Sequence, residues 1–154
     1  MAITEQQAQV ARRRKARHYV VQALYQWQMA ASPLNQIEAE FRTDNDFAKV
    51  DAEYFHELLH QVPACLGALD EAIAPALTDR SLDEVGPVEI AVLRMAVYEL
   101  QHRLDVPYKV VINEAVALTK KFGATDSHKF INAVLDKVVE KFRTVELKAA
   151  GRKA

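Results

Sequence analysis

Apolar side chains recur every three or four residues along nearly the whole chain, which is the spacing of one face of an α-helix. No segment shows the sustained alternation of apolar and polar residues that is typical of a half-buried β-strand. The pattern therefore predicts an all-α fold. The apolar stretches that predict helices lie at about residues 10–31, 34–41, 54–62, 66–78, 88–100, 111–122 and 131–142.

Proline, glycine and capping residues mark the expected ends of these helices. Pro63 kinks or ends the third helix, because its ring cannot fit a helix interior. Ser81 and Glu84 have the spacing of a capping box, and Pro87 suits the first turn of a new helix. Gly123 follows an apolar stretch at the position where helices commonly end on glycine.

The length and composition of the chain indicate its domain organisation. A chain of 154 residues, half of them hydrophobic, is expected to form a single domain over 1–154 with about six or seven helices. The stretch 88–100 is apolar nearly all round, which predicts a buried central helix. We expect a basic N-terminal arm at 11–18 and a frayed tail at 148–154.

Positive charge is concentrated near the start of a chain whose formal net charge is only −1. The cations concerned are Arg12, Arg13, Arg14, Lys15 and Arg17. Acidic residues gather elsewhere, between Glu38 and Glu57. This separation favours a directed contact with a polyanion, because guanidinium groups donate bidentately to phosphate. The alternative is a solvated tail that only aids solubility.

Composition also excludes several classes of protein. A single cysteine, Cys65, cannot form an internal disulfide, which fits a reducing compartment. The absence of a 20-residue apolar run and of a signal sequence predicts a soluble cytoplasmic protein. With 4 glycines and no serine in a GxSxG turn, the chain offers no phosphate cradle and no nucleophile elbow. We therefore expect no enzymatic activity and no cofactor.

One short motif suggests metal chemistry. His56-Glu57-Leu58-Leu59-His60 matches the HExxH pattern, in which two histidines on one helix face bind zinc and the glutamate activates water. The apolar residues of this helix lie on the opposite face, so these side chains are expected to point to solvent. Glu71, Asp79 and Glu84 are the candidates for a third ligand. We interpret the motif as accidental and expect no metal there.

Three longer blocks carry a resemblance to a known family. They are RRRKARHYVVQALYQWQ near the start, GPVEIAVLRMAVYEL in the middle, and DVPYKVVINEAVAL followed by KKFGATDSHKFINAVLDKV. Together they resemble the NusB family of bacterial transcription antitermination factors over nearly the full length. The resemblance implies two small helical bundles packed together and no catalysis. It also implies binding to boxA RNA of ribosomal RNA operons as a heterodimer with the ribosomal protein NusE, followed by assembly with other Nus factors on RNA polymerase.

The resemblance further implies which residues touch RNA. Arg14 and Arg17 match the arginines of the family's N-terminal motif, and Arg13 and Lys15 lie beside them. Such cations would neutralise phosphates or stack on unpaired bases. Three lysines and one tyrosine further along the chain could extend the basic path: Tyr108, Lys109, Lys121 and Lys129. The local alternatives are packing of Tyr108 at its own helix start and ordinary surface roles for the lysines.

Four residues match the family's interface with NusE, namely Tyr25, Glu89, Asp126 and Phe130. Aromatic side chains flanked by carboxylates would suit a basic ribosomal protein. Each has a local alternative. Tyr25 and Phe130 could belong to the core, Glu89 could favour a helix N-terminus through the macrodipole, and Asp126 could be an N-cap.

Two further functions stay open at this stage. The first is a helical protein–protein adaptor whose basic arm does not bind RNA. The second is a zinc hydrolase at the HExxH motif. The sequence does not decide between a monomer and a homodimer.

Overall fold

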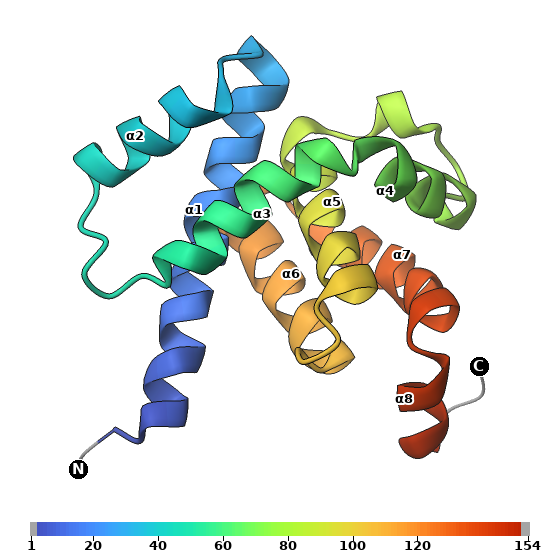
Figure 1. Cartoon of the computed structure of the whole chain (residues 1–154). Coiled ribbons are helices and arrows are strands. Elements are labelled where there is room, and N and C mark those ends of the chain that lie inside the picture. Colours follow the sequence, from blue (N-terminus) through green and yellow to red (C-terminus); the bar gives the residue numbers. More distant parts are fainter. Residues whose placement is uncertain (1–2, 152–154) are drawn as a thin grey trace. The chain divides into compact units, whose positions relative to one another are not determined.

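The computed structural model describes residues 3–151, and every regular element in that range is a helix (Figure 1). The all-α fold expected from the sequence is confirmed. The described chain forms two compact units, which divide between Ala64 and Cys65. The single domain expected over 1–154 stays a prediction.

Three helices make up the first unit: α1 (Glu5–Ala30), α2 (Leu34–Asp44) and α3 (Ala52–Ala64). Helix α1 packs against both α2 and α3, as Figure 1 shows. Most of the apolar residues that the helical spacing placed on one face are buried, although Trp27, Leu34 and Phe41 are half-buried and Ala31 is exposed. The fully buried side chains of this unit include Val20, Leu24, Ile37, Phe55, Leu58 and Leu59.

Helix α1 begins at Glu5, about five residues earlier than the apolar pattern predicted. Thr4 and Gln7 form a capping box: the Gln7 amide donates to Thr4 Oγ1 at 3.1 Å, and the Thr4 amide donates to Gln7 Oε1 at 3.1 Å. The basic arm at 11–18 is consequently helical. Within the described residues no helix, including α1, has the length and apolarity needed to cross a membrane.

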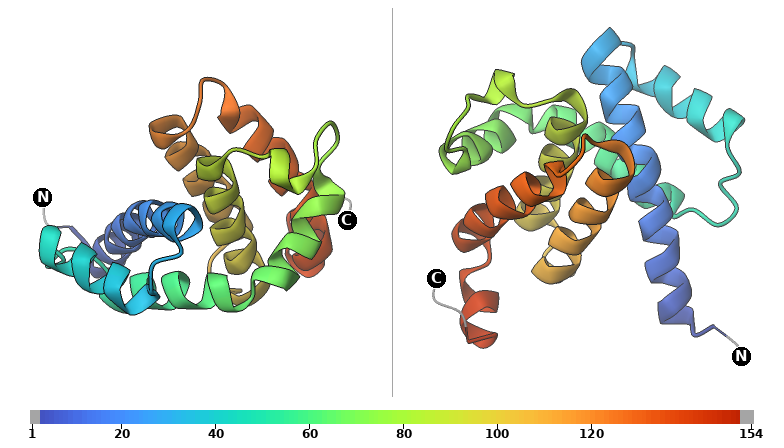
Figure 2. Two further views of the ribbon diagram at one scale, coloured as in Figure 1. Left: turned by 90° about the horizontal axis from the view of Figure 1, so that it is seen from above. Right: turned by 180° about the vertical axis from the view of Figure 1, so that it is seen from behind.

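The second unit is built around α5 (Pro87–His102), which packs against α4, α6 and α7 (Figure 2). Residues 95–100 of α5 are all buried, which confirms the expected central helix. The other elements are α4 (Leu66–Ile73), the 3₁₀ turns η1 (Ala74–Ala76) and η2 (Leu82–Glu84), α6 (Tyr108–Phe122), α7 (Ser127–Phe142) and α8 (Thr144–Ala149). The described residues thus contain eight α-helices, more than the six or seven predicted.

Two local signals predicted from the sequence in this unit are present in the structure. The capping box of Ser81 and Glu84 begins the 3₁₀ turn η2, and Pro87 occupies the first turn of α5 as expected. Hydrogen bonds from the backbone and the hydroxyl of Ser81 lower the pKa of Glu84. In the predicted frayed tail, residues 148 and 149 belong to α8, and 152–154 lie outside the described residues.

A buried arginine joins the end of α7 to the loop after α5. Arg143 is 4% exposed and separates α7 from α8. Its guanidinium donates to the carbonyls of Glu99, Leu100, Arg103 and Val106 at 3.2, 3.0, 3.0 and 2.9 Å. It also donates to Glu146 Oε1 at 2.6 Å. One side chain therefore satisfies several carbonyls at the C-terminus of α5, where a cation is favoured by the helix dipole.

Candidate functional site

The basic face of α1 is organised by an aromatic ring from α3. Arg13 and Arg17 lie one helical turn apart, and their guanidinium carbons lie 4.4 and 5.4 Å from the centroid of the Tyr54 ring. Both distances are in the range of cation–π contacts. Tyr54 is 3% exposed. The contact therefore holds two of the five clustered cations in place instead of leaving them free to sample solvent.

Asp51 fixes the start of α3 to α1. Its Oδ1 accepts a hydrogen bond from the Tyr54 amide at 3.0 Å, which caps the first turn of α3. Its Oδ2 accepts from Gln9 Nε2 at 3.0 Å and lies 3.6 Å from Arg13 Nε. The Asp51 amide donates to the Arg12 carbonyl at 3.1 Å. Neither Asp51 nor Tyr54 was assigned to the site from the sequence. Tyr54 lies on the apolar face of its helix, which predicted a core position, and Asp51 was one of several acidic residues in that region.

Not every predicted RNA-binding cation is on the surface. Arg14 and Lys15 are exposed, and so is Arg12. Arg13 keeps 22% of its side chain exposed, whereas Arg17 is only 3% exposed. The guanidinium carbon of Arg17 lies 5.4 Å from the centroid of the Tyr54 ring, and the role of this buried arginine in RNA binding stays a prediction.

The remaining RNA candidates belong to the second unit. Lys109 in the first turn of α6, Lys121 in its last turn and Lys129 in the first turn of α7 are all exposed. Lys109 and Lys121 are about 18 Å apart along the axis, at a rise of about 1.5 Å per residue. Tyr108 is 4% exposed, and its amide donates to Glu146 Oε2 at 2.9 Å. Burial favours the alternative in which Tyr108 packs at its helix start.

Glu89 holds the loop between α6 and α7 against the start of α5. Its Oε2 accepts a hydrogen bond from the Ala124 amide at 3.2 Å. Its carboxylate fills the space beside Gly86 and Gly123, where a β-carbon would collide with it. Gly123 ends α6 with extended backbone (φ −89°, ψ 179°), so glycine is required there by space and not by a left-handed conformation.

The other three candidate partner residues differ in environment. Asp126 precedes α7 in a left-handed conformation (φ 66°) but makes no side-chain cap, and its carboxylate lies 3.7 Å from Lys129 Nζ. Phe130 is half-buried, with the Arg80 guanidinium 4.3 Å from its ring centroid. In the first unit, Tyr25 is 40% exposed and so is not a core residue. The predicted N-cap position of Asp126 is confirmed, but its oxygens stay accessible.

We expect Gly123→Ala to lower the free energy of unfolding by about 1–3 kcal/mol, the cost of overpacking. The new β-carbon would lie 2.6 Å from Glu89 Oε2 and 2.8 Å from the Thr119 carbonyl oxygen, and the latter is backbone that cannot turn away. Urea denaturation followed by circular dichroism measures the change. The matched control is Gly67→Ala in α4, where nothing lies within 4 Å; it should stabilise by about 0.4–1 kcal/mol. Equal effects of the two changes would contradict the argument.

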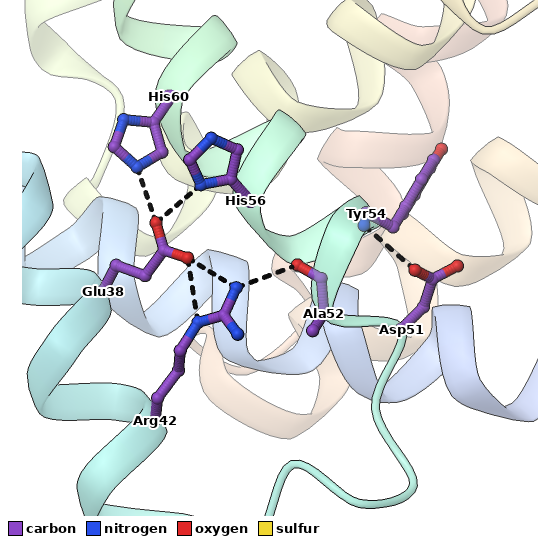
Figure 3. Close-up of polar contacts among 7 residues, drawn as sticks. All are labelled: Glu38, Arg42, Asp51, Ala52, Tyr54, His56 and His60. Atoms are coloured by element: carbon purple, nitrogen blue, oxygen red, sulfur yellow. Dashed lines mark hydrogen bonds and ion pairs between the residues drawn. The ribbon is translucent and has the colours of Figure 1, made fainter.

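The prediction that the HExxH side chains point to solvent is only partly correct. The His56 side chain is 58% exposed, but that of His60 is only 20% exposed. The carboxylate that meets both rings comes from Glu38 of α2, upstream of the motif and not among the predicted third ligands (Figure 3). Burial alone would raise the pKa of Glu38, but hydrogen bonds with His60, His56 and Arg42 outweigh it and lower that pKa.

The fold and the cationic face of α1 define a small all-helical protein suited to a polyanion. The chain belongs to the NusB family, whose sequence model matches residues 14–140. The transcription antitermination protein NusB of Saccharophagus degradans is 62% identical over 139 residues, covering 90% of this chain and 93% of that protein. The family resemblance drawn from the sequence is thereby confirmed.

Solved structures support the same assignment. The fold is similar to that of T. maritima NusB, with a TM-score of 0.76 and 30% identity over 88% of this chain and 96% of that one. It is also similar to a chain in the crystal structure of the antitermination factors NusB and NusE in complex with double-stranded RNA. There the TM-score is 0.72 and the identity 26%, over 84% of this chain and 96% of that one.

Proposed function

We propose that this chain is a transcription antitermination factor that binds boxA RNA together with NusE and performs no catalysis. The observation that carries the proposal is the 62% identity to an antitermination protein over nearly the whole length of both chains. A related NusB structure contains both NusE and RNA. As a factor that acts during transcription, it would work in the cytoplasm, with other Nus factors and RNA polymerase as further partners.

The RNA surface of the proposal starts on α1. Arg14 and Lys15 are exposed and would neutralise phosphates, and Arg13 is partly exposed beside them. Arg13 and Arg17 are held by Tyr54, so the helix face is ordered before RNA arrives. Lys109, Lys121 and Lys129 would extend the contact on the second unit. Phosphate contacts of this kind give affinity but little sequence information.

The NusE surface would use Tyr25, Glu89, Asp126 and Phe130. Asp126 supports this role best, because it adopts a left-handed backbone yet its carboxylate caps no helix. The Tyr25 side chain is exposed, and exposed tyrosines often contribute strongly to the binding energy of protein interfaces. Because phosphate contacts alone are unspecific, recognition of one RNA sequence would require the surface that this chain forms jointly with NusE.

The proposal predicts that NusE strengthens RNA binding cooperatively. Fluorescence anisotropy of a labelled boxA RNA, titrated with this protein with and without NusE, should show weak binding alone and tight binding together. An RNA with a scrambled boxA sequence is the control and should lose the gain. Equal affinity with and without NusE would contradict the joint surface. Absence of RNA binding by the folded protein in both titrations would favour the protein–protein adaptor.

A further inference from the structure

A carboxylate from α2 and two imidazoles from α3 meet at one point in the first unit (Figure 3). Glu38 Oε1 lies 2.8 Å from His56 Nδ1 and 2.7 Å from His60 Nε2. The two rings are neighbours, with centroids 4.3 Å apart, and one ligand atom from each of the three residues lies within 4.8 Å of the others. We propose that Glu38, His56 and His60 form a binding site for a divalent transition metal of the zinc class.

The donor set selects the class of metal. Two imidazole nitrogens and one carboxylate oxygen suit Zn²⁺, whereas Mg²⁺ and Ca²⁺ prefer ligand sets made of oxygen. Tetrahedral Zn²⁺ with bonds of about 2.0–2.2 Å would hold its ligand atoms roughly 3.3 Å apart. The two contacts to Glu38 Oε1 would therefore lengthen by roughly half an ångström. Small side-chain rotations suffice for this change.

The surroundings leave room for entry and for a fourth ligand. Side-chain exposure is 12% for Glu38, 20% for His60 and 58% for His56, so the cluster opens to solvent on the His56 side. A water molecule could complete a tetrahedral site from that side.

Arg42 orients the carboxylate from behind. Its Nε and Nη2 lie 2.9 and 2.7 Å from Glu38 Oε2, which leaves Oε1 to face the histidines. Hydrogen bonding of this kind commonly fixes metal-ligating carboxylates. The positive charge of Arg42 opposes a dication, so we expect weaker binding than at a thiolate-rich structural site.

Metal binding would require a change of tautomer at both histidines. The ionised carboxylate of Glu38 can only accept hydrogen bonds, so both ring nitrogens that face it carry a proton in the metal-free protein. A coordinating nitrogen must present its lone pair instead. Each neutral ring therefore gives up the proton at its coordinating nitrogen and takes one up at its other nitrogen, so it changes tautomer without a net release of protons.

The arrangement fits a structural metal site that cross-links two helices better than a hydrolytic centre. The ligands join α2 to α3, so a bound ion would cross-link two helices that the segment 45–51 connects. Glu57, which an HExxH hydrolase would use as its base, is not one of the three clustered residues. The site is separate from the arginines on Tyr54 and does not depend on the proposed RNA function.

The test is a calorimetric titration of ZnCl₂ into chelator-stripped protein, with Co²⁺ absorption as a probe of coordination geometry. We expect one equivalent of Zn²⁺ to bind and the Tm to rise, because the ion binds the folded state. His60→Ala and Glu38→Gln should each weaken binding by more than about 100-fold, the upper range for loss of an outer-shell partner. Circular dichroism checks that both variants fold.

Two matched controls keep the site intact. His102→Ala removes an exposed histidine in α5, and Glu40→Gln removes an exposed carboxylate on α2. Both should bind Zn²⁺ with unchanged affinity. The proposal is overturned if wild-type protein binds no stoichiometric Zn²⁺, if either ligand variant binds as tightly as wild type, or if a control variant loses the site.

Discussion

Replacing Arg143 with alanine is expected to lower the free energy of unfolding by about 3–5 kcal/mol, the cost of removing one partner from a buried charged network. The change would leave the carbonyls of Glu99, Leu100, Arg103 and Val106 without the guanidinium that each accepts from. The carbonyls of Glu99 and Arg103 would keep the backbone amides of Arg103 and Val106 as donors. Those of Leu100 and Val106 would lose the donor that Arg143 supplies, and burial makes each unsatisfied carbonyl costly. Urea denaturation followed by far-ultraviolet circular dichroism measures the loss.

Two companion variants isolate the cause. Arg143→Lys keeps the charge but cannot donate in the planar fork that reaches several carbonyls, so most of the loss should remain. Lys137→Ala removes an exposed cation from α7, the helix that ends just before Arg143, and should change stability by less than about 0.5 kcal/mol. If Arg143→Lys restored wild-type stability, charge alone would account for the effect and the carbonyl network would not.

Replacing both Arg14 and Lys15 with alanine is expected to weaken RNA binding strongly without unfolding the protein. Both side chains are exposed, and alanine is the best helix former, so α1 should persist. If each cation neutralises one phosphate, the slope of log affinity against log salt should become shallower by about 0.7 per lost contact. Anisotropy titrations of boxA RNA with NusE at several salt concentrations measure that slope.

The matched control is Lys49→Ala, an exposed cation of the first unit outside the basic arm. It should leave the salt slope unchanged. A second comparison uses Tyr54→Leu, which removes the ring beneath Arg13 and Arg17 but no charge. It should lower affinity while the slope stays near that of wild type, because the phosphate contacts remain. An unchanged slope in the Arg14 and Lys15 variant would exclude these residues from the RNA surface.

The features that sequence predicted well depend on local spacing. The apolar stripes gave the core of α3 and the central position of α5, because side chains three or four residues apart share a helix face. Pro87 and the N-cap position of Asp126 were found from another local signal, the residue preferences at helix starts. The start of α1 was placed too late, since the capping box at Thr4 lies before the first apolar stripe.

The features that sequence missed depend on partners far along the chain. Arg143 bonds to carbonyls 37 to 44 residues earlier, and no periodic signal marks such a contact. Glu38 lies 18 and 22 residues before the histidines that it meets. The burial of Arg17 was likewise hidden, because a run of cations reads as solvent-exposed until the ring that covers one of them is located.

Because the Tyr108 amide donates its hydrogen bond to Glu146, the exchange of that amide proton reports whether the C-terminal helix α8 is docked. That amide is the first of α6, where no carbonyl of its own helix can accept from it. Its protection from deuterium exchange therefore rests on α8 staying docked, with Glu146 held by Arg143. The exchange rate at Tyr108 thus measures how often α8 undocks while the rest of the unit remains folded.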